Sequence, residues 1–277
     1  MVNILSIHFG IHDSSAALFS DYRVVAAIQR ERLTREKKAG GAPKECIDEV
    51  LSIGALSHSD IDVVVFSRAE FPRSLFKTDF FRKIRDNFKG TFLSSRDLST
   101  VMIKAGTSTP EDVLDIVALL KFYGLPTTAE IMFSNHHYAH ALPSLFFTDW
   151  EDALLYTADG AGDNVNYSHR IFKDGEIRTL FGDDHWLHKP YRIDSLARAY
   201  ANVTEALGFK PLHHEGKITG LAAYGKPTLK ADFQSHFSFD KDGLINSNFP
   251  NGTIMREQFM ALCDEASRED AAASIQE

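Results

Sequence analysis

A pattern of strand, turn and hairpin occurs twice in this sequence and limits the folds that the chain can adopt. Residues 3–9 form a short apolar run that ends in a turn, and two β-type runs follow over residues 15–28. The same order returns over residues 153–181, with a hairpin turn at residues 173–176. Both first turns contain Gly-x-x-Asp, as Gly10 to Asp13 and Gly160 to Asp163. The repeat predicts an α/β fold with duplicated strand–turn–hairpin units, and two such turns facing each other could grip one polyphosphate.

Between these units the sequence predicts helices and one further strand. Residues 43–53 have the apolar spacing of a helix, and the β-branched residues 61–66 indicate a buried strand. Residues 69–107 interleave Phe with Lys and Arg. This favours an irregular helical cap with buried rings over an insertion that faces nucleic acid or membrane. A capped helix is expected to run from Thr109 to Leu120.

After Gly182 the chain is expected to be helical. Residues 195–207 carry apolar side chains at helical spacing, and Gly208 provides a stop. Residues 271–277 resemble a helix that is cut before its natural end, because no capping Gly or Pro is present there.

Composition narrows the class of protein. The chain has 277 residues and a formal net charge of -8, which opposes nucleic-acid binding through bulk charge. No apolar run approaches the length of a transmembrane helix, and the N-terminus lacks the basic start of a signal peptide. Two cysteines cannot build a disulfide framework and fit a reducing compartment. We therefore expect a soluble, cytoplasmic protein that binds neither nucleic acid nor membrane.

His136 and His140 are the clearest candidates for metal ligands. A separation of four residues places both imidazoles on one face of a helix, and neutral imidazole suits zinc, iron and nickel. Asp159 ends an apolar run and begins a glycine-rich turn, so its carboxylate is expected at the exposed end of a strand. These residues predict a three-ligand site with open positions, whereas His137 points elsewhere on the helix. Paired histidines also occur as surface or hydrogen-bonded core residues, so that alternative stays open.

The turn after the first strand could take part in catalysis. Its backbone N–H groups from Gly10 onward can cradle phosphate oxygens, and His12 and Asp13 could act as a general base or orient a substrate hydroxyl. The alternative is an ordinary turn, in which Gly and Asp are common. The mixed-charge run over residues 31–38 is typical of a solvated face, although near a phosphate it would supply cations.

A second glycine-flanked segment contains a lysine. Gly216 and Gly220 flank Lys217, which suggests close approach of the backbone to a ligand and a phosphate contact from the lysine. The alternative is a helix start with tight packing between glycines.

Taken together, these residues resemble the NodU/CmcH-type O-carbamoyltransferases from residue 4 to about residue 227. The shared motifs are, in order, Gly10-x-His12-Asp13-Ser14-Ser15-Ala16, Glu31-Arg32-Leu33-Thr34-Arg35-x-Lys37, Asn135-His136-His137-x-Ala139-His140-Ala141, Asp159-Gly160-x-Gly162-Asp163 and Glu215-Gly216-Lys217-x-x-Gly220-Leu221-Ala222-Ala223-Tyr224-Gly225. The resemblance implies a TsaD-like domain of the actin/sugar-kinase/heat-shock superfamily, with a nucleotide between two related subdomains. It implies subdomain I over residues 1–190, with a helical insertion at about 69–125, and the start of an incomplete subdomain II over residues 191–277.

The same resemblance implies the chemistry and the cofactors. In the family, a YrdC-like domain makes carbamoyladenylate from carbamoyl phosphate and ATP, and the TsaD-like domain moves the carbamoyl group to a hydroxyl of an alcohol or sugar. A divalent metal, with Fe2+ favoured and Zn2+ as the alternative, would bind His136, His140 and Asp159, and Mg2+ would accompany the nucleotide. Asp13 would be the base, with His12 as the second choice. The expected nucleotide contacts are Gly10, Lys37, Gly160, Gly162, Glu215, Gly216, Lys217 and Gly220.

This sequence departs from the family pattern in its length. The second half of the TsaD-like domain, with a fourth metal ligand, and the YrdC-like domain are absent. We therefore expect a truncated chain that is inactive alone, and a homodimer only for the full-length enzyme. The alternatives are a metal-dependent hydrolase or a kinase on the same fold, or a non-catalytic nucleotide-binding module.

Overall fold

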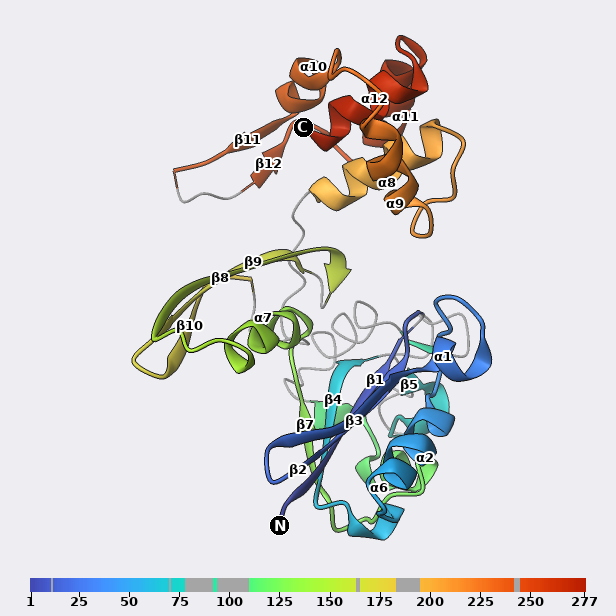
Figure 1. The fold of residues 1–277 in the computed structure, drawn as a ribbon, viewed down its shortest axis with the longest axis vertical. Helices are drawn as coiled ribbons and strands as arrows, with labels where there is room; N and C mark the ends of the chain where they lie inside the picture. Colours follow the sequence, from blue (N-terminus) through green and yellow to red (C-terminus); the bar gives the residue numbers. More distant parts are fainter. Residues whose placement is uncertain are drawn as a thin grey trace. The chain divides into compact units, whose positions relative to one another are not determined.

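The computed structural model describes eight stretches of the chain: residues 1–10, 12–69, 71–77, 92–93, 110–162, 165–182, 195–241 and 245–277. They divide into two compact units. The first comprises residues 1–157 and 162–191, and the second comprises residues 158–161 and 192–277. Figure 1 labels most of their helices and strands.

A mixed five-stranded sheet forms the base of the first unit (Figure 1). Its strands are β1 (Asn3–Phe9), β2 (Ser15–Ser20), β3 (Arg23–Gln29), β4 (Val63–Ala69) and β7 (Glu130–Phe133). The strand order is β3-β2-β1-β4-β7, with β1 antiparallel to β2 and parallel to β4. Every second side chain of β1 is buried, which is the period expected of a strand that packs one face against a core.

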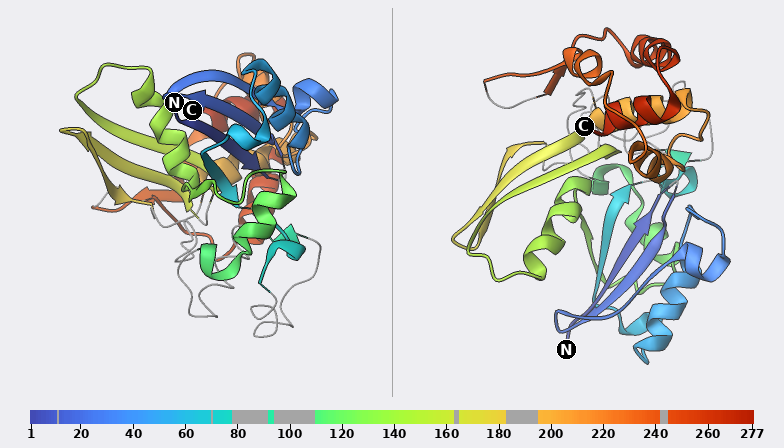
Figure 2. Two further views of the ribbon diagram at one scale, coloured as in Figure 1. Left: turned by 90° about the horizontal axis from the view of Figure 1, so that it is seen from below. Right: turned by 45° about the horizontal axis from the view of Figure 1, so that its top comes forward.

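Short helices complete the core of this sheet. They are α1 (Arg30–Thr34), α2 (Lys44–Ile53), α5 (Pro110–Val113) and α6 (Ile116–Phe122), with 3-10 turns η1 (His58–Asp60) and η2 (Arg73–Leu75). Helix α2 contacts β2 and β3 (Figure 2). Its apolar side chains share one buried cluster with those of β1, β4 and α6. A two-stranded ribbon of β5 (Phe71–Pro72) and β6 (Phe92–Leu93) lies outside the main sheet.

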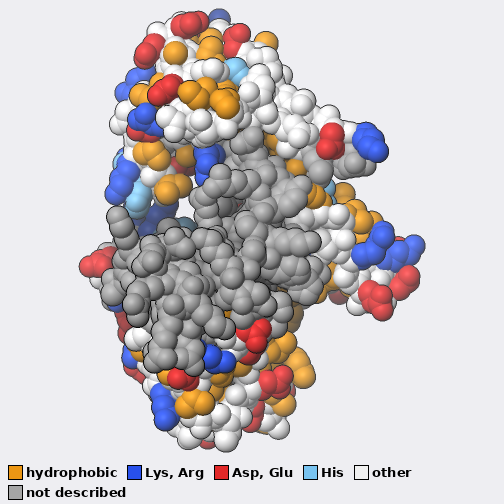
Figure 3. Space-filling view, turned by 180° about the vertical axis from the view of Figure 1, so that it is seen from behind, with side chains coloured by type: hydrophobic (Ala, Val, Ile, Leu, Met, Phe, Trp, Pro, Cys, Tyr) orange, Lys and Arg blue, Asp and Glu red, His pale blue; other side chains and the backbone are white. Residues whose placement is uncertain are grey.

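A second sheet contains β8 (Asp152–Gly162), β9 (Val165–Lys173) and β10 (Glu176–Phe181), in the order β10-β9-β8. Helix α7 (His136–Phe146) contacts both β9 and β4, so it packs against one strand of each sheet. The predicted hairpin turn is confirmed, because Asp174 and Gly175 both have positive φ, at 53° and 78°. Figure 3 shows acidic and basic side chains mixed at the tip of this hairpin, as on a solvated loop.

The second unit is mainly helical. It contains α8 (Leu196–Ala206), α9 (Glu215–Ala222), α10 (Lys230–Ser235), α11 (Gly252–Asp264) and α12 (Arg268–Gln276), with the hairpin β11 (Phe237–Phe239) and β12 (Ile245–Ser247). Helix α8 packs against α11, and α9 packs against α12. Their shared core includes Val203, Met255 and Phe259, all of which are fully buried. Of the described helices, none is both long and apolar enough to span a bilayer.

The structure confirms the α/β fold and the duplicated unit, since β1–β3 and β8–β10 are the two copies of the sequence pattern. It corrects the prediction that Asp159 begins a turn. Strand β8 continues through Gly162. The absence of a side chain at Gly162 allows the extended backbone to pass close to the ring of His136. Asp163, the end of the predicted motif, lies outside the described residues.

The predicted helix from Thr109 to Leu120 is two helices. Asp115 has an extended backbone, with φ -81° and ψ 94°, and its side chain accepts a hydrogen bond from the backbone N–H of Ala118. It therefore caps α6 and separates it from α5. Thr109 and most of the predicted insertion over residues 69–107 lie outside the described residues.

Candidate metal centre

Helix α7 carries the two histidines that were predicted as ligands. It begins after Asn135, whose side-chain oxygen accepts a hydrogen bond from the backbone N–H of Tyr138 at 2.9 Å, as an N-cap residue does. His136 lies in the first turn and His140 one turn later, and their Nε2 atoms are 3.1 Å apart. The predicted pairing on one face of a helix is therefore present.

Asp159 of β8 completes a three-residue group. One donor atom from each of His136, His140 and Asp159 lies within 4.8 Å of the other two. A tetrahedral metal bound at about 2.1 Å from each donor would hold the donors about 3.4 Å apart. The Nε2 atoms of the two imidazoles already lie near that spacing, and the carboxylate oxygen needs a movement of about 1.5 Å at most. Two imidazoles, one carboxylate and an exposed side formed by His140 suit a divalent metal with open coordination positions.

Gly162 makes room for the buried imidazole. A Cβ atom at this position would lie 1.8 Å from Cδ2 and 2.4 Å from Nε2 of His136. Because β8 passes directly against the ring, any side chain here would displace a ligand. Gly160, two residues earlier, has free space around it, and its backbone N–H donates to Oδ1 of Asp159.

The turn that follows β1 places His12 and Asp13 together. Nδ1 of His12 lies 2.8 Å from Oδ2 of Asp13, and the two side chains are 42% and 39% exposed. Asp13 has a φ of 55°, in the left-handed region that Asp tolerates better than most residues. A half-exposed carboxylate that is oriented by an imidazole is a reasonable general base for a hydroxyl.

The loop that contains Lys37 packs onto this turn. The backbone N–H of Ser14 donates to Ala39 O at 3.0 Å, and the N–H of Gly41 donates to Gly10 O at 2.8 Å. The structure therefore brings Gly10, His12, Asp13 and the Lys37 loop into one cluster of the first unit.

An ion pair anchors the two ends of this loop. Nε of Arg30 lies 2.6 Å from Oε1 of Glu45. Burial alone raises the pKa of Glu45, but the hydrogen bond and the positive charge of Arg30 hold it below its ordinary value. The pair is therefore charged at neutral pH, and it ties the start of α1 to the start of α2.

The predicted Glu215–Gly220 segment lies in the second unit and forms α9. Its glycines are not used for tight packing, since a Cβ at Gly216 or Gly220 would meet no atom within 4 Å. Nζ of Lys217 lies 5.7 Å from the ring centroid of Phe209. Glu215 accepts a hydrogen bond from the backbone N–H of Leu212.

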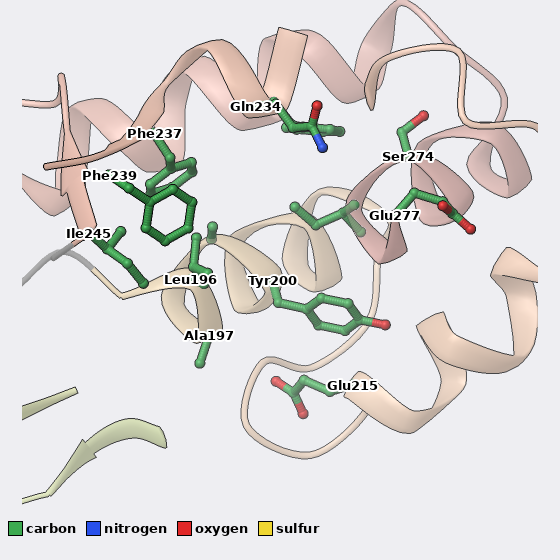
Figure 4. A pocket seen from close by; sticks show the side chains of 13 residues that line it. Leu196, Ala197, Tyr200, Glu215, Gln234, Phe237, Phe239, Ile245, Ser274 and Glu277 are labelled. Atoms are coloured by element: carbon green, nitrogen blue, oxygen red, sulfur yellow. The ribbon is translucent and has the colours of Figure 1, made fainter. Parts of the chain in front are cut away.

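Glu215 also lines a pocket of about 710 Å³ within the second unit. Figure 4 shows Glu215 and Tyr200 at one end of this pocket and Phe237, Phe239 and Ile245 at the other. The pocket is therefore mainly apolar, and of the predicted nucleotide contacts in this segment Glu215 alone is among its lining residues. The nucleotide contacts of Glu215, Gly216, Lys217 and Gly220 stay a prediction.

A buried polar network that was not predicted from the sequence lies beside the metal group. Asn135, His137, Thr157, Ser168 and Arg170 are all buried. Ser168 and Arg170 are two residues apart on β9, so the sequence places both polar side chains on one face of that strand. This pattern does not identify a buried network, because strands with one solvated face show the same alternation.

Comparison with known proteins gives the family. A sequence model of the family described as carbamoyltransferase N-terminus matches residues 3–276. The uncharacterized protein sll1178 of Synechocystis is 30% identical over 236 residues, which are 82% of this chain and 35% of that protein. Nodulation protein NolNO of Sinorhizobium fredii is 25% identical over 232 residues, which are 82% of this chain and 30% of that protein. The chain spans about a third of the length of these relatives.

Solved structures show looser likenesses. Component A of (R)-2-hydroxyglutaryl-CoA dehydratase from Acidaminococcus fermentans aligns with 99% of this chain and 73% of its own, at 11% identity and a TM-score of 0.46. YeaZ from Pseudomonas aeruginosa aligns over 66% of each chain, at 13% identity and a TM-score of 0.33.

Proposed function

The chain belongs to the carbamoyltransferase family, whose N-terminal region it matches over residues 3–276, and we propose that it transfers a carbamoyl group from carbamoyladenylate to a hydroxyl of a small alcohol or sugar. The acceptor oxygen forms a bond to the carbamoyl carbon, the bond from that carbon to the adenylate oxygen breaks, and AMP leaves. The proton of the hydroxyl passes to a base. Carbamoyladenylate would be made from carbamoyl phosphate and ATP by another domain of a longer enzyme.

The observation that carries this proposal is the convergence of His136, His140 and Asp159 in a chain of this family. The three residues would hold a divalent metal, with Fe2+ favoured and Zn2+ as the alternative, since imidazole and carboxylate accept both. A metal bound there would supply a Lewis acid that polarises the carbamoyl or phosphate oxygens. Half-buried Asp159 and buried His136 would also keep water away from one side of the reacting group.

Asp13 is the proposed base. Its Oδ2 atom is held by His12 at 2.8 Å, so one carboxylate oxygen remains to accept the proton of the acceptor hydroxyl. Backbone N–H groups of the turn at Gly10 and the cation of Lys37 would bind the adenylate phosphate, because the Lys37 loop is hydrogen-bonded to that turn. These contacts would align the carbamoyl carbon with the hydroxyl.

The test uses the polypeptide from the whole reading frame that contains this chain. It is incubated with carbamoyl phosphate, ATP, metal and a panel of alcohols and sugars, and the nucleotide products are separated. We expect AMP and pyrophosphate together with a carbamoylated acceptor, and losses of at least about 100-fold for His136→Ala and Asp13→Asn. Release of ADP with a phosphorylated acceptor would instead identify a kinase. AMP release that is unchanged in both variants would remove these residues from the mechanism.

A further inference from the structure

A buried cation lies beneath the first turn of α7. Arg170 of β9 has no exposed surface. A guanidinium stays charged in proteins, so its burial is costly unless its N–H groups donate hydrogen bonds. Arg170 donates to Oγ of Ser168 and, through Nη2, to Oδ1 of Asn135 at 3.4 Å. The same Asn135 oxygen caps α7, so the guanidinium is connected directly to the start of the helix that carries the histidines.

The network continues from Ser168 to the strand that carries the carboxylate. Oγ of Ser168 lies 2.6 Å from Oγ1 of Thr157 on β8, and that oxygen lies 2.8 Å from Nδ1 of His137 on α7. All of these side chains belong to the first unit. Arg170 therefore belongs to a chain of buried hydrogen bonds, between Asn135 and Ser168, that links β9 to β8 and both strands to α7.

The network is attached next to the metal-binding residues. Asn135 and His137 flank His136, and Thr157 precedes Asp159 by two residues on the same strand. A helix that slid or rotated on β8 by one ångström would break the 2.8 Å bond of His137 and also change the distance from His136 to Asp159. The same bonds therefore fix both the packing of α7 and the spacing of the ligands.

We propose that Arg170 is a positioning residue for the metal centre: through Asn135 and Ser168 it holds the first turn of α7 on β8, so that His136, His140 and Asp159 converge. This inference rests on the proposed function, in which a metal binds those three residues. Arg170 itself contributes no ligand. Its role is to fix the donor geometry before the metal arrives, which raises the affinity for metal.

A purely structural role would lower the thermal stability without a specific effect on metal binding. The test therefore measures both properties on the polypeptide from the whole reading frame that contains this chain. Arg170→Met removes the hydrogen bonds and keeps an unbranched apolar stem. Arg178→Met is the matched control, because Arg178 is an exposed arginine on the neighbouring strand β10. Zn2+ affinity is measured by competition with a chromophoric chelator, Co2+ coordination by its visible absorption, and melting temperature without metal.

We expect Arg170→Met to weaken Zn2+ binding by about 10–100-fold and to change the Co2+ absorption, as loss of residues behind metal ligands does. Arg178→Met should leave both unchanged. Wild-type Zn2+ affinity and an unchanged Co2+ spectrum in folded Arg170→Met would overturn the proposal and leave the proposed function intact. If wild type binds neither metal, the metal-assisted function itself fails, and this inference fails with it.

A second variant decides the case in which Arg170→Met does not fold. Ser168→Ala removes the hydroxyl that connects Arg170 to Thr157 but leaves the buried guanidinium bonded to Asn135. Weaker Zn2+ binding in a folded Ser168→Ala chain supports the positioning role. Wild-type binding in that chain contradicts it.

Discussion

Replacement of Gly162 by alanine tests the geometry of the metal centre most directly. The added Cβ would lie 1.8 Å from Cδ2 of His136, whereas ordinary contact begins at 3.4 Å, so the ring or the strand must move by about 3.4 − 1.8 = 1.6 Å. Metal–ligand distances tolerate deviations of only about 0.2 Å. The movement is several times larger than that tolerance, so His136 should cease to be a ligand.

The expected result is a loss of Zn2+ affinity of at least about 100-fold, at or beyond the upper end of the effect of residues that support ligands. The stability cost should be about 1–3 kcal/mol, which is typical of overpacking. The affinity is measured by chelator competition and the stability by urea unfolding without metal. A loss of stability with no loss of affinity would show that the strand, rather than the ring, gives way.

Gly160→Ala is the matched control for this experiment. It lies on the same strand, and its Cβ would meet no atom within 4 Å. Its Zn2+ affinity should stay within about twofold of the wild type, because the added methyl group reaches nothing. If the Gly162→Ala chain bound Zn2+ as tightly as the Gly160→Ala chain, the conclusion that His136 leaves no room for a side chain at position 162 would be refuted.

Two further predictions concern ionisation outside the site. Burial raises the pKa of Cys46 and of Cys263 to about 11, with the neighbouring carboxylates of Glu45 and Asp264 adding to the effect. We expect neither thiol to react with a disulfide reagent at pH 8 in the folded chain and both to react in guanidinium; fast reaction of the folded chain would contradict their burial. Arg256 donates hydrogen bonds to Glu205 at 2.7 and 2.5 Å, and these hold the pKa of Glu205 below its ordinary value of 4.5. A lowered carboxyl pKa stabilises the fold above that pH and ceases to do so as the pH falls through the folded-state value. Arg256→Gln should therefore lower the melting temperature slightly at pH 7 and less at pH 3, and a difference that does not shrink at low pH would show that charge is not its cause.

The elements with strong local signals could be predicted from the sequence. Helix α2 follows from its apolar spacing, α8 ends near Gly208, whose φ is 76°, and the hairpin at Asp174 and Gly175 needs two positive φ angles. The pairing of His136 and His140 on one face of a helix follows from their separation of four residues alone. In each case the decisive interaction lies within a few residues along the chain.

The parts that depend on distant contacts could not be predicted. Gly160 and Gly162 suggested a turn because glycine is common in turns. In the structure, Gly162 lies in a strand, and the position has no room for a side chain because the ring of His136 on α7 lies against it. Nothing in the sequence around Arg170 indicated that it is fully buried, because its hydrogen-bond partners include Asn135, which is 35 residues away along the chain. His137 was set aside, yet its bond to Thr157 connects α7 to β8. The sequence around each of these residues does not indicate which distant residue it contacts.

The position of β1 in the middle of its sheet has a consequence for the order of folding. Its antiparallel partner β2 follows at once, so β1–β3 can form as a local meander within microseconds. Its parallel partner must come from much further along, since Ile4 pairs with Val63, and Val63 in turn pairs with Glu130. The pairing of β4 with β1 and the pairing of β7 with β4 each close a long loop of the chain. Loop closure has an entropic cost, so these two pairings are the slow steps of folding. Until β4 pairs with β1, the unpaired edge of β1 can pair with strands of other chains. During synthesis, the chain is therefore most prone to aggregate before residue 69, the end of β4, has left the ribosome.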